Sequence, residues 1–234
     1  AKAADLLVLG TSRSMQFHSE FFTTDSFYNA GGGAGYINEF QFFLENLPEG
    51  SLPDTLIMVM DQYLFNQAWT GTGGMPQAFD YGHYEFDPPK ALFSAMRDWA
   101  QGKYSLWDVF ASHPNVYGMA AVGRGSGYNA DGSYDYGRLM DYPEEGTDVG
   151  FHDTFDRILR GINRFEPAEY VYPVSTEKVE QLLAWCNDRQ IRVVLIVPPY
   201  APSVWERMEQ TGKYGYFAWI IKILNELCEP YGYE

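Results

Sequence analysis

Cysteine and histidine, the side chains that most often build metal sites, are scarce in this chain. Its 234 residues include 2 cysteines, Cys186 and Cys228, and 4 histidines. No pair of them has the spacing of metal ligands, and the acidic residues follow no calcium-loop pattern. We therefore expect neither a metal nor a cofactor. Both cysteines fall in predicted helices with apolar neighbours, which favours buried free thiols, although their spacing does not exclude a disulfide.

Basic residues are also few. Lysine and arginine total 16 against 31 aspartates and glutamates, so the formal net charge is −15 at pH 7. Because such a chain repels nucleic-acid phosphates, we expect no nucleic-acid partner. The negative charge does not argue against a neutral or cationic substrate.

Long apolar segments are missing as well. No run approaches the ~20 residues that a membrane-spanning helix requires, and no signal peptide is visible. A strand is nevertheless predicted almost at the first residue, and natural chains rarely begin so abruptly. We therefore expect a leader or an anchor segment before Ala1 in the parent protein.

The chain does contain enough apolar residues for one folded domain. Hydrophobic residues make up 46% of the sequence and aromatic residues 17%, and this length allows a full core. Short apolar runs alternate with segments of helical spacing, which predicts a parallel sheet with helical crossovers. The expected strands lie at 5–9, 26–30, 55–60 and 193–197, with the approach to a fifth at 232–233. The expected helices lie at 14–22, 36–46, 175–189, 203–211 and 214–229.

One long segment interrupts this alternation. Residues 67–174 are rich in Gly, Tyr, Asp and Trp, with a few helical stretches such as 90–101 and 153–163. A segment of this length between two strands is typical of an insertion or a lid rather than of a single loop. We therefore expect one α/β domain over 1–234. It would be a three-layer sandwich of flavodoxin-like type with a parallel sheet of four or five strands, and the large irregular insertion would lie at the carboxyl-end rim of the sheet.

The end of the first predicted strand carries the most informative residue. Gly10-Thr11-Ser12 follows the apolar run, which places Ser12 at the carboxyl end of a strand, where open α/β sheets bind ligands. A serine there can be a nucleophile with backbone N–H groups beside it, or it can cap the following helix. Arg13, directly after it, can hold a carboxylate or phosphate, or it can pair with an acidic residue of the chain.

A glycine cluster follows the second predicted strand. Gly31-Gly32-Gly33-Ala34-Gly35 matches the first two positions of a dinucleotide-binding fingerprint, but Tyr36 stands where the third glycine is required. This disfavours an intracellular nucleotide-binding protein. The cluster is then either a tight turn that needs a positive φ or a turn whose backbone N–H groups bind an oxyanion.

Three short motifs follow the first three predicted strands: Gly10-Thr11-Ser12-Arg13-Ser14, then Asn29-Ala30-Gly31-Gly32-Gly33, then Asp61. Together they resemble the SGNH (GDSL-type) hydrolase superfamily, in particular its divergent, membrane-tethered branch of D-alanyl transfer and polysaccharide O-acetyltransferase proteins. The resemblance covers about 1–66 and 175–234. It implies that Ser12 is the nucleophile and that Gly33, or its neighbour Gly32, gives a backbone N–H to the oxyanion.

The remaining catalytic groups of the family have no clean match. No asparagine stands at the end of the third strand, where Asp61 is found, so Gln62 or Asn66 would be the amide donor. The family's Asp-x-x-His motif follows the last strand, and we expect it beyond Glu234. Asp80-Tyr81-Gly82-His83 has the same pattern, but it lies in the insertion and outside the family's chain order. Asp80 and His83 are therefore alternative candidates for the catalytic acid–base pair. The isolated His18, His113 and His152 are more typical of surface or packing residues.

The resemblance implies a serine esterase or acyltransferase that acts on an extracytoplasmic glycan or polymer. Such a protein would be periplasmic or at the cell surface, membrane-anchored in its full length, with a membrane acyltransferase or an envelope complex as partner. The present chain would then be a fragment without its anchor, last strand and base motif. The alternative is a catalytically inactive domain of the same fold that serves as a binding or assembly component.

Overall fold

The structure, a computed structural model, describes residues 4–69, 87–111, 115–118, 121, 125–146 and 148–234. Its strands are β1 (Leu6–Gly10), β2 (Phe27–Gly31), β3 (Thr55–Val59), β4 (Gly127–Tyr128), β5 (Tyr134–Asp135) and β6 (Arg192–Ile196). Its helices are α1 (Ile37–Glu45), α2 (Pro88–Ala100), α3 (Leu106–Ala111), α5 (Arg138–Asp141), α6 (His152–Arg160), α7 (Pro173–Asp188), α8 (Pro202–Thr211) and α9 (Phe217–Cys228).

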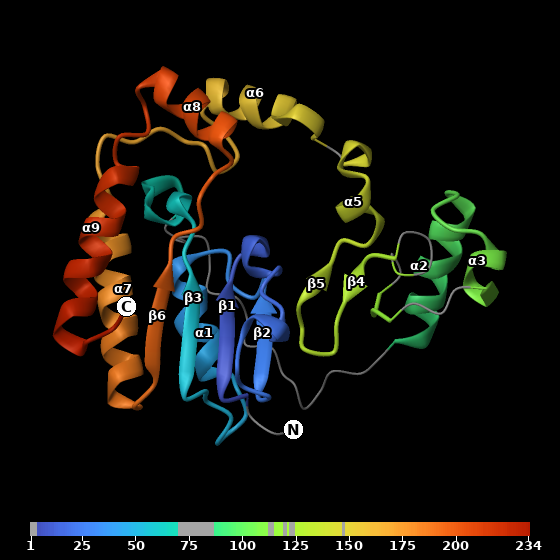
Figure 1. The fold of residues 1–234 in the computed structure, drawn as a ribbon, viewed down its shortest axis with the longest axis horizontal. Coiled ribbons are helices and arrows are strands. Elements are labelled where there is room, and N and C mark those ends of the chain that lie inside the picture. Colours follow the sequence, from blue (N-terminus) through green and yellow to red (C-terminus); the bar gives the residue numbers. More distant parts are fainter. Residues whose placement is uncertain (1–3, 70–86, 112–114, 119–120, 122–124, 147) are drawn as a thin grey trace.

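Four parallel strands form the central sheet, in the order β2-β1-β3-β6 (Figure 1). In the register of this sheet, Leu6 of β1 stands opposite Phe27 on one side and Thr55 on the other. The apolar runs predict all four strands to within one residue at either end, because strands buried on both faces need apolar residues at consecutive positions. The α/β class and the parallel sheet are therefore confirmed.

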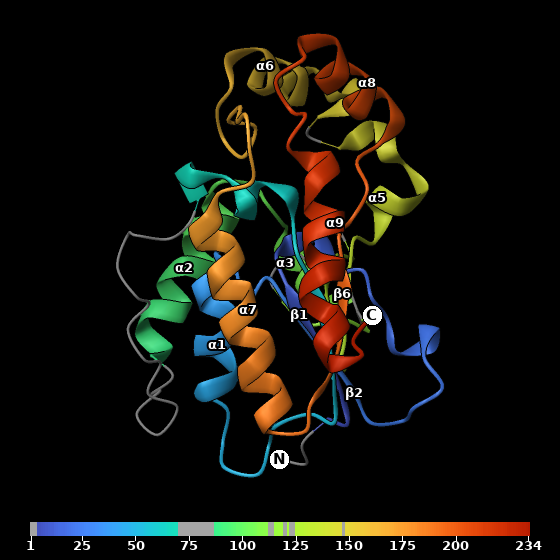
Figure 2. The ribbon, with the colours of Figure 1, turned by 90° about the vertical axis from the view of Figure 1, so that its left-hand side faces the viewer.

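The two faces of the sheet are covered by different segments. One face packs against α1, α7 and α9, in a core that includes the fully buried Leu9, Phe40 and Leu183; Figure 2 shows α1 and α7 side by side. The other face, around Val8, is covered by phenylalanines of the segment that follows β1. This segment therefore has a packing role as well as leading into the candidate site.

Residues 14–22, predicted as a helix, instead form two short 3₁₀ turns at Ser12–Ser14 and Ser19–Phe21. Asn29 of β2 explains the difference. Its Nδ2 donates to the Ser14 carbonyl at 2.9 Å and to the Phe17 carbonyl at 2.8 Å. In an α-helix these carbonyls would accept amides four residues further on, so tertiary hydrogen bonds take the place of helical ones.

The order of the strands reverses at β1. The chain passes from β1 to β2 on one side and then returns to β3 on the other. Open α/β sheets bind ligands in the crevice outside the carboxyl ends of the strands at such a switch point. The turns that follow β1 and β3, which carry Ser12 and Asp61, lie at this place.

The predicted insertion contains regular structure where it is described. Helices α2 and α6 match the stretches expected at 90–101 and 153–163, whereas the β4–β5 hairpin was not expected. The hairpin docks on the edge strand β2, where Asn29 N donates to Asp131 O at 2.7 Å. Gly132 in its turn has φ +82, and a Cβ there would collide with the Asn29 carbonyl oxygen. This docking occupies backbone groups of an edge strand that would otherwise be open.

The last residues of the chain lie beside the opposite edge strand, β6. Leu195 N donates to Glu234 O at 2.7 Å, and the Arg192 guanidinium binds the Glu234 side chain at 2.8 Å. The segment interpreted as the approach to a fifth strand is thus placed next to β6.

Both cysteines are buried and free. Burial raises the pKa of the Cys186 thiol from 9.0 to about 12, and it also raises the pKa of Cys228. Because the thiolate is the reactive form, we expect Ellman's reagent to react with neither thiol in the native protein near neutral pH and with both in concentrated guanidinium chloride. Rapid reaction of the native protein would contradict the packing described around Cys186.

Candidate functional site

Ser12 lies exposed on the turn that follows β1, at the carboxyl edge of the sheet. The residue that caps this turn is Thr11, whose Oγ1 accepts the Arg13 amide at 3.3 Å. Ser12 is therefore not the cap. Within the part of the chain that the structure describes, neither the hydroxyl nor the backbone amide of Ser12 has a hydrogen-bond partner. Both groups are available to an outside molecule.

The glycine turn that follows β2 adjoins the Ser12 turn. Gly32 N donates to Gly10 O at 2.9 Å and to Thr11 O at 3.1 Å. Gly32 has φ +84, a backbone conformation that side chains with a Cβ rarely adopt. The turn thus meets the positive-φ requirement expected from the sequence, and it shares the carboxyl edge with Ser12.

The amides of this glycine turn are engaged inside the protein. Gly33 N donates to Ala30 O at 3.0 Å, and Gly35 N donates to Glu39 Oε2 at 2.6 Å. Gly32 N is held by the two carbonyls of the neighbouring turn. An oxyanion can use the Gly33 amide only if its bond to Ala30 first breaks, so the Ser12 amide is the better placed donor.

Arg13 and Asp61 form the centre of the candidate site. The Asp61 side chain has no exposed surface, and one of its oxygens lies 2.6 Å from Arg13 Nη1. Its other oxygen accepts the Thr11 hydroxyl. Of the two interpretations given to Arg13, pairing within the chain is thus the one that the structure displays, and the pair joins the turn after β1 to the turn after β3.

The loop that follows β6 holds the rest of the Arg13 guanidinium. Nη2 donates to the Pro198 carbonyl at 3.2 Å and to the Pro199 carbonyl, and Cζ lies 4.6 Å from the centroid of the Tyr200 ring. Gln62, next to Asp61, accepts from Nη1 at 3.2 Å. One arginine therefore ties together the segments that follow three strands of the sheet.

Asn66 does not join this group. Its Nδ2 donates to Glu166 O at 2.8 Å, and its Oδ1 accepts Ala68 N at 2.9 Å. It lines a separate pocket of about 530 Å³. Both ends of the amide are engaged, so the geometry does not favour Asn66 as a donor to an oxyanion.

No histidine among the described residues contacts Ser12. His18 Nδ1 lies 3.1 Å from Ser133 Oγ, and His152 is exposed at the start of α6. The candidates Asp80 and His83 lie outside the described residues. Neither of the two described histidines is therefore placed to act as the general base for Ser12.

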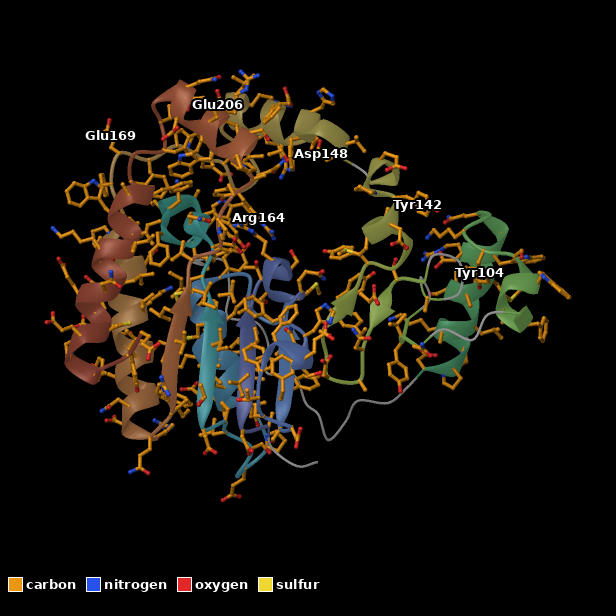
Figure 3. The ribbon with its side chains drawn as sticks, in the orientation of Figure 1. Tyr104, Tyr142, Asp148, Arg164, Glu169 and Glu206 are labelled. Carbon is orange, nitrogen blue, oxygen red and sulfur yellow. The ribbon has the colours of Figure 1, made fainter. Side chains whose placement is uncertain are left out.

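A pocket of about 290 Å³ lies at this edge of the sheet, beside the packed helices α6 and α8. Arg13, Asp61 and Tyr63 line it from the segments after β1 and β3, and Arg157 and Arg164 line it from the insertion. Figure 3 shows Arg164 between the top of the sheet and the helices above it. The insertion thus contributes directly to the pocket at the carboxyl edge.

The two insertion arginines were not anticipated from the sequence. They belong to no motif. Arg157 lies on α6, which packs on α8, and Arg164 lies in the segment that follows α6. One signal could have indicated them: Arg157, Arg160 and Arg164 fall within eight residues of an otherwise acidic chain. A local excess of basic residues in such a chain marks a place where negative charge can be bound.

The chain matches no model of a known protein family, no curated protein and no solved structure. None of the described helices is both long enough and apolar enough to cross a bilayer. The described residues also include no group of three or more histidine, cysteine, aspartate or glutamate side chains arranged to hold a metal ion.

Asn29 is expected to be essential to the position of the Ser12 turn. Its side chain is buried, donates to two carbonyls and accepts Gly31 N at 2.6 Å. Asn29→Ala leaves the Phe17 carbonyl and the Gly31 amide without these partners, and it removes one of the two bonds to the Ser14 carbonyl, which also accepts Phe17 N. We therefore expect the unfolding free energy to fall by about 2–3 kcal/mol in urea denaturation. The control Asn225→Ala, exposed on α9, should change it by less than about 0.5 kcal/mol. Equal effects of both substitutions would show that Asn29 does not hold the turn.

Proposed function

We propose that the protein is a serine esterase or acyltransferase of the SGNH type with Ser12 as its nucleophile. The observation that carries the proposal is the exposure of Ser12 at the switch point, with hydroxyl and amide both unpaired among the described residues. One residue then offers a nucleophile and a donor to the oxyanion that forms when it attacks. A parallel sheet in the order β2-β1-β3-β6 is compatible with that fold.

The proposed reaction has two steps. Ser12 Oγ attacks the carbonyl carbon of an acyl ester, its proton passes to a general base, and the alcohol of the donor leaves with that proton. Water or a sugar hydroxyl then attacks the acyl-Ser12 ester, gives its proton to the base, and releases the acyl group while Ser12 regains its hydrogen. The base in this proposal is a histidine from outside the described residues, either His83 with Asp80 or one beyond Glu234.

The proposed substrate and setting follow from the resemblance of the three motifs. The acyl acceptor is a glycan or polymer outside the cytoplasm. The protein is periplasmic or at the cell surface, membrane-anchored in its full length, and it works with a membrane acyltransferase or within an envelope complex.

Two observations favour a second function, that of a binding or assembly component without catalysis. The amides of Gly32 and Gly33 are already bonded, and no described histidine contacts Ser12. A domain of this fold without a base would still present the pocket around Arg13. Whether Ser12 reacts with an acyl group separates the two functions.

Trapping of the acyl-enzyme tests the proposal. The full-length protein is mixed with p-nitrophenyl acetate, quenched in acid, digested, and analysed by mass spectrometry. We expect a burst of p-nitrophenol together with an acetyl group on the peptide that contains Ser12. A wild-type protein that carries no acetyl group on Ser12 would favour the binding function.

A further inference from the structure

The pocket beside Asp61 is cationic, although the chain has a formal net charge of −15. Three arginines line it, and Asp61 is the one carboxylate among its described lining residues. One Asp61 oxygen accepts from Arg13 and the other from Thr11, so this carboxylate is already satisfied. Two positive charges, those of Arg157 and Arg164, remain to be balanced within the lining.

Each of the three arginines is stacked on an aromatic ring. Their Cζ atoms lie 4.6, 5.3 and 4.9 Å from the ring centroids in the pairs Arg13–Tyr200, Arg157–Phe165 and Arg164–Tyr63. Stacking orients the plane of a guanidinium and leaves the N–H groups along its edge for an acceptor. The arginines are therefore held in place by neighbouring rings.

The free N–H groups belong mainly to Arg164. Arg157 Nη2 donates to Thr154 at 2.9 Å, and its Nε lies 2.9 Å from an oxygen of Asp153. Because the Asp153 side chain is 69% exposed, water screens that pair strongly. Within the described chain, Arg164 makes no ion pair and no hydrogen bond through its side chain.

The backbone at Arg164 is also unusual. Asn163 and Arg164 have φ values of 53° and 78°, in the left-handed region that residues other than glycine rarely occupy. Such conformations persist where the surrounding structure holds them, and they are concentrated at sites that clamp ligands. The chain therefore maintains a strained backbone at the arginine that is least paired.

We propose that this pocket binds an organic oxyanion, a carboxylate or a phosphate ester, through Arg164 and Arg157, with Arg13 as a positioning residue. Guanidinium edges bind both oxyanions in a bidentate manner. The volume of about 290 Å³ is at the lower end of the range for small-molecule pockets, which suits one charged ring of the size of a monosaccharide. Ser12 is not a lining residue, so this binding does not depend on acyl chemistry.

Isothermal titration calorimetry with glucuronate, glucose 6-phosphate and neutral glucose tests the proposal. We expect at least one anion to bind at least about 10-fold more tightly than glucose, and Arg164→Gln to weaken that binding by about 10- to 100-fold. Arg164→Gly should weaken it equally, because glycine suits the left-handed backbone and only the guanidinium is lost. Preference for one anion would identify a sugar acid or a phosphate ester as the source of the charge.

Two further variants complete the experiment. Arg160→Gln is the matched control, because Arg160 ends the helix α6 that also carries Arg157, is 63% exposed and pairs with Asp156, and neither residue lines the pocket. Anion binding by this variant should equal that of the wild type. Ser12→Ala should also bind normally, which separates this result from the proposed catalysis. Binding of neither anion more tightly than glucose, or equal losses in Arg160→Gln and Arg164→Gln, would overturn the proposal.

Discussion

Replacing Asp61 by alanine is expected to lower the free energy of unfolding by about 3 kcal/mol. Removal of one member of a buried ion pair typically costs about 3–5 kcal/mol, because the other charge stays without compensation. Asp61 is fully buried, but the Arg13 side chain is 30% exposed and keeps two carbonyl partners. The lower end of the range therefore applies. Urea denaturation followed by circular dichroism measures the change.

The matched control for this experiment is Asp54→Ala. Asp54 is exposed just before β3, at the opposite end of the strand from Asp61, so we expect its loss to change stability by less than about 0.5 kcal/mol. A double substitution of Arg13 and Asp61 by apolar residues of similar size should recover part of the loss, since no unpaired charge remains. An Asp61→Ala protein as stable as the control would show that the pair does not join the two turns.

Replacing Ser12 by alanine is expected to lower kcat/KM for acyl transfer by a factor on the order of 10⁶, the scale seen when a serine nucleophile is removed. The same substitution should leave the unfolding free energy within about 0.5 kcal/mol of the wild type. Ser12 is exposed, and no described residue bonds to its hydroxyl. Steady-state kinetics with an activated ester, paired with urea denaturation, measures both effects.

The control for this prediction is Ser203→Ala, which removes an exposed serine from the first turn of α8. Neither activity nor stability should change. If Ser12→Ala retained most of the activity, Ser12 would not be the nucleophile; if it unfolded the protein, the description of Ser12 as an exposed residue without partners would be wrong.

The strands and most helices could be predicted from the sequence because their signals are local. The run 55–60 is apolar at every position after Thr55, and β3 (Thr55–Val59) is buried on both faces. The prediction of a helix over 14–22 was wrong for the opposite reason. The Asn29 side chain of β2 donates hydrogen bonds to two carbonyls of this segment. Residues distant in sequence decide that conformation, and periodicity does not report them.

Some residues of the candidate site could be predicted from local sequence signals, and others could not. Ser12, Arg13 and Asp61 were identified because each follows a predicted strand, and parallel strands bring their carboxyl ends to one edge. Arg157 and Arg164 were missed because they belong to no motif, and because the packing of α6 on α8 joins segments that are distant in the sequence. The engagement of the Gly33 amide with Ala30 is likewise a matter of turn geometry, which the glycine cluster alone does not determine.

Labelling with a fluorophosphonate probe tests the central claim most directly, namely that Ser12 is a reactive serine at the switch point of the sheet. An activated serine attacks the phosphorus of the probe, expels fluoride and remains covalently modified. The account predicts that full-length wild-type protein and Ser203→Ala are labelled to the same extent, while Ser12→Ala is not labelled. Equal labelling of wild type and Ser12→Ala, or no labelling of either, would contradict it.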